Sequence, residues 1–175
     1  ELWRTSTIAR EGEPGGDTWS GLPTMYRAGG DAWIPGSFDP VTKVVYWGTA
    51  QAKPWHASAR GTDGEALYTN STLAIDPKTG MKKWSYRLSA PMTEAGVLTT
   101  ASDMLFSGGR DGSFFALDAR TGKLLWQTNL GPSVAAGPMT YAVNGKQYVS
   151  IMAGGSMFTF GLREPAAPAP AAARP

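Results

Sequence analysis

The chain has 175 residues, 42% of them hydrophobic, and a formal net charge of +2 at pH 7. This length suits one domain or part of a larger one, and so mild a charge without a basic run argues against nucleic acid as a partner. The absence of cysteine excludes disulfides and thiolate metal sites, and no apolar run approaches the roughly 20 residues of a membrane helix, so no membrane span is expected.

Short strands separated by turns follow one another along the chain, in keeping with 22 glycines and 13 prolines. The strands are expected, in chain order, at residues 44–47, 71–75, 83–87, 97–100, 104–107, 114–117, 124–129, 140–143 and 147–151. The turn Phe38-Asp39-Pro40 precedes the first of them, and Asn144-Gly145, the strongest short hairpin signal, separates the last two. No convincing amphipathic helix is present. The sequence therefore predicts an all-β fold.

Two stretches of the chain repeat each other, LAIDPKTGMKKW at 73–84 and FALDARTGKLLW at 115–126. Both follow the pattern A-x-D-x-x-T-G-x-x-x-W, and their tryptophans, Trp84 and Trp126, stand 42 residues apart. A period of about 40–45 residues is typical of four-stranded propeller blades. The Asp and the Thr-Gly pair predict a tight turn between two strands. We assign both tryptophans a structural role, and Trp3 the same position in an earlier repeat.

The repeat predicts a β-propeller of four-stranded antiparallel blades. The chain has room for about two to three blades: a partial blade up to Arg87, a full blade over about 95–129 and a last sheet over 135–162. Because propellers close with about four to eight blades, residues 1–162 are expected to form a partial propeller. A second copy or a chain with complementing blades would cover its open apolar faces. Residues 163–175, rich in Pro and Ala, are expected to form a disordered tail.

The stretch GGDAWIPGSFDPVTKVVYWGTAQAKPW at 29–55 is more specific than the repeat. Together with RGTDGEALYTNSTLAIDPKTG after it, it resembles the pyrroloquinoline quinone (PQQ)-dependent alcohol dehydrogenases, the quinoproteins related to methanol dehydrogenase. The repeat resembles the tryptophan-docking motif of that family, in which the Trp packs onto the turn of the next blade. The resemblance covers residues 1–162. It implies an eight-bladed propeller, a periplasmic location, PQQ with calcium or a lanthanide, alcohol oxidation by hydride transfer to PQQ, and a cytochrome c or other respiratory electron acceptor.

Three positions are implied as site residues by the resemblance. Trp33 in GGDAW matches the Trp that stacks beneath PQQ, and a flat indole suits a flat quinone; otherwise Trp33 packs against a neighbouring blade. Asp31 occupies the position of a cofactor-bonding Thr. Gln51 in WGTAQAKPW replaces a metal-binding Asn and offers an amide oxygen to a hard cation, although it is one methylene longer; otherwise it bonds the loop backbone. We expect Asp31 and Trp33 to contact PQQ and Gln51 to contact the metal.

No catalytic residue is assigned. In the family, the segment that matches the one after Arg87 is of the type H-D-x-W-D and supplies the Asp base, whereas this chain continues LSAPMTEAGVLTT. His56, the only histidine, falls in an expected surface loop. The chain thus resembles a truncated and internally shortened quinoprotein, without a visible signal peptide, and turnover by this chain alone is not expected. The alternative function is a non-catalytic propeller module for protein–protein interaction or assembly.

Overall fold

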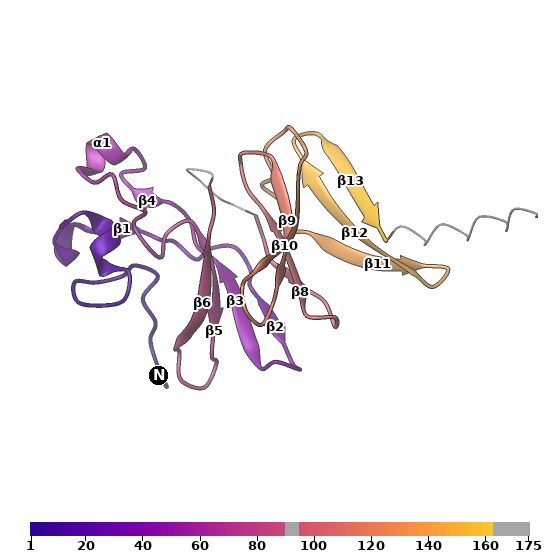
Figure 1. Ribbon diagram of the computed structural model, residues 1–175, viewed down its shortest axis with the longest axis horizontal. Coiled ribbons are helices and arrows are strands. Elements are labelled where there is room, and N and C mark those ends of the chain that lie inside the picture. The colour runs from indigo at the N-terminus through magenta and orange to yellow at the C-terminus, as the bar shows by residue number, and fades with distance from the viewer. Residues whose placement is uncertain (90–94, 163–175) are drawn as a thin grey trace, which may run out of the picture.

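The computed structural model describes residues 1–89 and 95–162 (Figure 1), so the expected disordered tail over 163–175 lies outside the described residues. The strands of the described part are β1 Ala28–Gly29, β2 Ser37–Asp39, β3 Val44–Gly48, β4 Ala52–Lys53, β5 Ser71–Ile75, β6 Lys82–Arg87, β7 Leu98–Thr99, β8 Met104–Gly108, β9 Ser113–Asp118, β10 Leu124–Asn129, β11 Met139–Val143, β12 Lys146–Ala153 and β13 Ser156–Gly161. Its helices are short: α1 Ala57–Arg60 and the 3₁₀ turns Gly16–Trp19 and Thr24–Tyr26. No helix in the described ranges is long and apolar enough to cross a bilayer.

The strands form three blade-like antiparallel sheets that follow one another along the molecule (Figure 1). The first blade has the order β2-β3-β5-β6, the second β7-β8-β9-β10, and the third sheet β11-β12-β13, while β1 and β4 form a separate pair. The predicted class, an all-β partial propeller of four-stranded blades, is confirmed. The prediction that the first blade is partial is wrong. Its innermost strand, β2, is only three residues long and pairs with β3 through Asp39 and Val44.

The repeated motif forms the same turn in both blades. The side chain of Asp76 accepts the backbone N–H groups of the second and third residues after it, at 2.8 and 3.3 Å. The side chain of Asp118 accepts the equivalent pair, both at 2.9 Å. The following Gly80 and Gly122 have φ of +73° and +74°, a conformation that glycine adopts without steric cost. The motif thus determines the turn between the last two strands of each blade.

Strand β9 has two apolar faces because the second blade lies between the other two sheets. Phe115 and Leu117 belong to a buried cluster with the first blade, whereas Phe114 and Ala116 belong to a cluster with the third sheet. Successive strand side chains point to opposite faces, so β9 supplies both interfaces. Two of the buried clusters are therefore contacts between sheets, as expected for a propeller, and a third, around Trp19, lies outside the three sheets.

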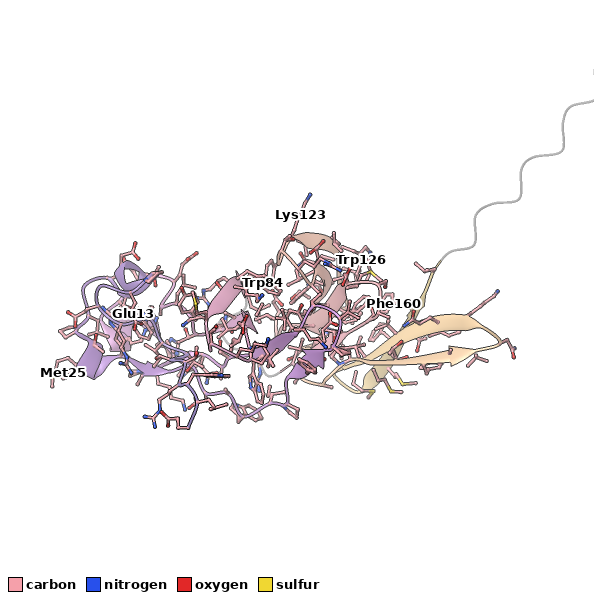
Figure 2. The ribbon with its side chains drawn as sticks, turned by 90° about the horizontal axis from the view of Figure 1, so that it is seen from below. Glu13, Met25, Trp84, Lys123, Trp126 and Phe160 are labelled. Atoms are coloured by element: carbon pink, nitrogen blue, oxygen red, sulfur yellow. The ribbon has the colours of Figure 1, made fainter. Side chains whose placement is uncertain are left out.

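The last strand of each four-stranded blade carries the tryptophan of the repeat, Trp84 on β6 and Trp126 on β10 (Figure 2). The indole N–H of Trp3 donates to the carbonyl of Pro77 at 2.7 Å, and that of Trp84 donates to the carbonyl of Ala119 at 3.1 Å. Both acceptors directly follow the turn aspartate. Trp126 is 40% exposed and contacts the edge of the Phe160 ring in the third sheet. The first two tryptophans therefore each bind the turn of the blade that follows them.

Candidate functional site

The paired strands β1 and β4 bring the two halves of the specific motif together. Gly29 pairs with Ala52, the backbone N–H of Gly30 donates to the carbonyl of Gln51 at 3.1 Å, and that of Ala50 donates to the carbonyl of Asp31 at 2.8 Å. Gly29 has a φ of +101°, and a Cβ there would lie 2.3 Å from the carbonyl oxygen of Gln51. This approach requires glycine. The backbone of Asp31 thus lies beside the segment that carries Gln51. This arrangement is necessary if the two residues contribute to one site.

The carboxylate of Asp31 forms an ion pair with the ammonium of Lys53, with 2.6 Å between Oδ2 and Nζ. The two side chains are 42% and 53% exposed, and a pair so accessible to water contributes at most about 1 kcal/mol to stability. Lys53 follows Ala52 on β4. It places a positive charge beside the carboxylate of Asp31, a feature that the sequence reading missed.

Trp33 lies in the loop before β2 and is 62% exposed. This exposure leaves the indole accessible for stacking or for packing against a further blade. Gln51 directly precedes β4 and is half-buried. Within residues 1–89 and 95–162 no three His, Cys, Asp or Glu side chains gather as a metal-binding group. Trp33 thus offers an accessible ring, and the segment of Gln51 lies beside that of Asp31.

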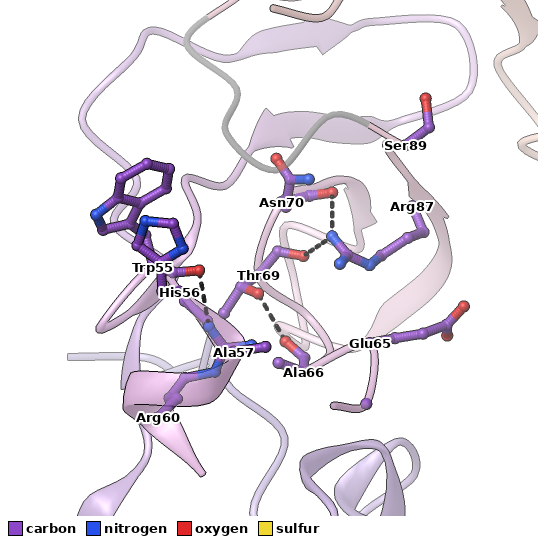
Figure 3. Close-up of a pocket in the computed structure, with 12 residues that line it drawn as sticks. Trp55, His56, Ala57, Arg60, Glu65, Ala66, Thr69, Asn70, Arg87 and Ser89 are labelled. Carbon is purple, nitrogen blue, oxygen red and sulfur yellow. Dashed lines mark hydrogen bonds between the residues drawn. The ribbon is translucent and has the colours of Figure 1, made fainter. Parts of the chain in front are cut away.

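A pocket of about 450 Å³ lies beside α1 (Figure 3). Ala52, which follows Gln51, is part of its wall, and the backbone N–H of Asn70 donates to the carbonyl of Ala50 at 2.8 Å. The pocket therefore adjoins the segment that carries Gln51. Its lining residues are Ala52, Trp55, His56, Ala57, Arg60, Gly64, Glu65, Ala66, Thr69, Asn70, Arg87 and Ser89.

Two arginines reach this pocket from different elements. The guanidinium of Arg60 donates to the carbonyls of Pro54 and Trp55 at 2.8 and 3.1 Å. That of Arg87 donates to the carbonyls of residues 69 and 70 at 3.4 and 3.3 Å (Figure 3). Burial lowers the pKa of both guanidinium groups, and the Glu65 carboxylate opposes this for Arg87. Sequence reasoning missed the pocket because its lining residues are scattered over positions 52 to 89 of the chain.

His56 is exposed at the start of α1, and its ring contacts that of Trp55 with 3.9 Å between the centroids. This position agrees with the loop expected from the sequence. The segment expected to correspond to the family's Asp base comes after Arg87, and its residues 90–94 lie outside the described part of the chain. The absence of an assigned base therefore stays a prediction from the sequence.

The chain matches a sequence model of the PQQ family described as "Glucose/ethanol/alcohol dehydrogenase, beta-propeller domain" over residues 1–91 and 88–149. It is 43% identical to the 1-butanol dehydrogenase (cytochrome c) of Thauera butanivorans over 70% of this chain and 21% of that protein. It is 33% identical to the quinohemoprotein alcohol dehydrogenase of Comamonas testosteroni over 83% of this chain and 23% of that protein.

Among solved structures, a europium-containing methanol dehydrogenase superposes with a TM-score of 0.57 and 26% identity, over 75% of this chain and 25% of that one. The chain therefore spans about a quarter or less of the length of these relatives. The matched residues include the paired segments around Gly29 and Gln51 and both copies of the repeat. The chain belongs to the family of PQQ-dependent alcohol dehydrogenases, the β-propeller quinoproteins.

Proposed function

We propose that this chain is part of a PQQ-dependent alcohol dehydrogenase and supplies one wall of its cofactor site. The observation that carries the proposal is the contact of Gly29 with the Gln51 backbone, which places Asp31 and Gln51 on adjacent segments. Trp33 lies two residues after Asp31 with its ring exposed. Stacking, polar and metal-binding groups thus lie within two short, paired segments.

Each side chain has a distinct role in this proposal. The indole of Trp33 stacks on the flat ring of PQQ. Lys53 neutralises Asp31 and donates a charge-assisted hydrogen bond to a carboxylate of the cofactor. The amide oxygen of Gln51 is one ligand of a calcium or lanthanide ion, whose other ligands come from outside this set of residues. PQQ, when bound, supplies a hydride acceptor for the alcohol.

We further propose that alcohol oxidation and electron transfer to a cytochrome c belong to the whole assembly to which these blades contribute. The named relatives include one that is cytochrome c-linked, and their much greater length leaves room for the base and the missing blades. A general base typically contributes about 10²–10⁴-fold to the rate, so the 175-residue chain alone should turn over little or no alcohol. By its family, we place the protein in the periplasm.

The test is a titration of the chain with PQQ, first with calcium and then with a light lanthanide, followed by quenching of tryptophan fluorescence. Trp33→Ala is the site variant. Trp55→Ala is its matched control, because Trp55 is also exposed, at 51%, but lies on the pocket beside α1. We expect saturable, metal-dependent quenching that Trp33→Ala abolishes and Trp55→Ala retains.

Loss of quenching in Trp55→Ala alone would place the cofactor in the pocket beside α1 and contradict the role of Trp33. No saturable quenching in any of the three proteins would contradict cofactor binding by this chain. In that case the non-catalytic module for protein–protein interaction would be the better explanation of its open blade faces.

A further inference from the structure

The pocket beside α1 has two arginine side chains in its wall, and the proposed cofactor site uses neither of them. Arg60 ends α1 and Arg87 ends β6, and both are half-buried. Neither Trp33 nor Asp31 is among the residues that line this pocket. Its volume of about 450 Å³ lies within the range of small-molecule sites, roughly 300–1,000 Å³. The pocket is therefore large enough for a ligand of its own.

Hydrogen bonds to neighbouring oxygens hold both guanidinium groups in place. Arg60 donates from Nη1 to the carbonyls of residues 54 and 55 and from Nε to the hydroxyl of Thr62, at 2.8, 3.1 and 3.3 Å. Arg87 donates from Nη1 to the carbonyls of residues 69 and 70 at 3.4 and 3.3 Å. A guanidinium has five N–H donors, so these bonds leave donors of both groups for a ligand.

The oxygens that accept these bonds are neutral, so they do not neutralise the two positive charges. Burial is the largest influence on the pKa of Arg87 and lowers it; the Glu65 carboxylate raises this pKa, and the positive charge of Arg60 lowers it further. The two arginines and the exposed Glu65 give the wall a formal charge of +1. A bound anion would reduce both the cost of burying these charges and their mutual repulsion.

The rest of the wall suits an apolar ligand body. Trp55 and His56, whose ring centroids are 3.9 Å apart, lie on the side of the pocket opposite Arg87 (Figure 3). Trp55 is 51% exposed, so a face of its indole is accessible for stacking. Ala57 and Ala66 also line the pocket. The wall thus combines arginine donors on one side with aromatic and methyl groups on the other.

We propose that this pocket binds a small organic carboxylate, with the carboxylate group between Arg60 and Arg87 and the apolar body against Trp55. The planar guanidinium fork matches the geometry of a carboxylate. Because both arginines are already held by the protein, little side-chain freedom is lost when the anion binds. The site is separate from the place proposed for PQQ at Trp33, and the inference does not depend on PQQ binding.

The test measures the binding of benzoate to the 175-residue chain by isothermal titration calorimetry. Arg60→Gln and Arg87→Gln are the site variants, and each removes one positive charge. Arg120→Gln is the matched control, because it makes the same change of charge in the turn of the second blade, where Arg120 pairs with Asp103 at 2.8 Å. Benzamide, a neutral analogue, tests the need for the charge, and inorganic phosphate tests the need for the apolar body.

We expect saturable binding of benzoate that is about tenfold weaker or more in each site variant, since each loses a charge-assisted hydrogen bond. Arg120→Gln and Trp33→Ala should bind benzoate as the unmodified chain does. Benzamide and phosphate should bind about tenfold more weakly than benzoate. Circular dichroism checks that each variant is folded. Arg87→Lys, which keeps the charge but not the planar fork, replaces an unfolded Arg87→Gln and should also weaken binding.

No binding of benzoate, or equal affinity in the unmodified chain and the site variants, would overturn the proposal. Equal affinity for benzamide or for phosphate would overturn the assignment of an organic carboxylate. Displacement of benzoate by PQQ, or loss of benzoate binding in Trp33→Ala, would assign the pocket to the cofactor and overturn a separate site. Binding of benzoate by a chain that fails to bind PQQ would uphold this proposal and contradict only the proposed cofactor wall.

Discussion

Trp84 of the first blade lies against Gly122 of the second: a Cβ at Gly122 would be 2.7 Å from Cε3 of the indole. Two donors of the first blade also share one acceptor in that turn. The indole N–H of Trp84 and the hydroxyl of Tyr46 donate to the carbonyl of Ala119 at 3.1 and 2.7 Å. The turn of the second blade is therefore held against the first blade by packing and by two hydrogen bonds. Substitutions in this turn should weaken the interface between the two blades.

The contact at Gly122 can be tested with Gly122→Ala. The new methyl group meets the ring of Trp84, and overpacking of this kind typically costs about 1–3 kcal/mol. Gly131→Ala is the control, because Gly131 has a similar positive φ of +85° but no atom within 4 Å of a Cβ. The free energy of unfolding, measured by urea denaturation, should fall by about 1–3 kcal/mol more in Gly122→Ala than in the control. Equal losses would show that the Trp84 contact is dispensable.

Trp84→Phe should destabilise the protein more than Trp126→Phe. The first substitution removes the hydrogen bond to Ala119, which is worth about 1 kcal/mol net, together with packing on Gly122. Trp126, at the same position of the repeat, is 40% exposed and keeps ring contacts through a phenyl group. Thermal unfolding followed by circular dichroism gives the two midpoints. A lower midpoint for Trp126→Phe would contradict the importance of the docked position.

The free energy of unfolding should decrease as the pH is lowered, because the turn aspartates Asp76 and Asp118 become protonated. The backbone and side-chain hydrogen bonds from Thr121 to Asp118 lower the pKa of its carboxyl, and the backbone N–H of Lys78 is the largest of the influences that lower the pKa of Asp76. A lowered pKa in the folded state means a contribution that is present above the unfolded value of about 4 and is lost as the pH falls through the folded value.

Asp118→Asn should therefore reduce the slope of unfolding free energy against pH below about 4, because its amide does not titrate. Urea denaturation between neutral pH and about pH 3 measures the slope. Asp76→Asn should have a similar and additive effect, since the two turns are separate. An unchanged slope in the double variant would contradict the role of these carboxylates.

Gly29→Ala should disrupt the pairing of β1 with β4 and displace the proposed cofactor-binding residues Asp31 and Gln51. Its methyl group would lie 2.3 Å from the backbone oxygen of Gln51, which cannot move without breaking the β1–β4 pair. Gly21→Ala is the control, because Gly21 also has a positive φ, +75°, but an open surrounding. We expect Gly29→Ala to lose PQQ-dependent fluorescence quenching and Gly21→Ala to keep it. Normal quenching in Gly29→Ala would show that PQQ binding does not depend on the contact between Gly29 and Gln51.

Gln51→Asn should strengthen lanthanide binding in the presence of PQQ, whereas Gln51→Ala should weaken it. The shorter amide matches the Asn of the family, and the alanine variant removes the oxygen ligand. Terbium luminescence sensitised by tryptophan reports the affinity directly and does not require turnover. Equal affinities in the three proteins would exclude Gln51 as a ligand.

Much of the blade architecture could be inferred from the sequence because the relevant interactions are local. Asp76 and Asp118 bond backbone groups two and three residues away, so the turn is encoded within the motif that forms it. Likewise, Asn144-Gly145 forms the expected hairpin, with φ of +51° and +77°. The period of 42 residues then predicted repeated sheets of one kind.

Only the tertiary structure showed which distant segments meet. The three residues of β2 are too few for a sequence pattern, yet their pairing with β3 completes the first blade. The contact of Gly29 with Gln51, the ion pair of Asp31 with Lys53 and the pocket shared by Arg60 and Arg87 join residues that are 20 or more positions apart. Such contacts depend on how the sheets pack in space, and no local pattern of residues specifies them.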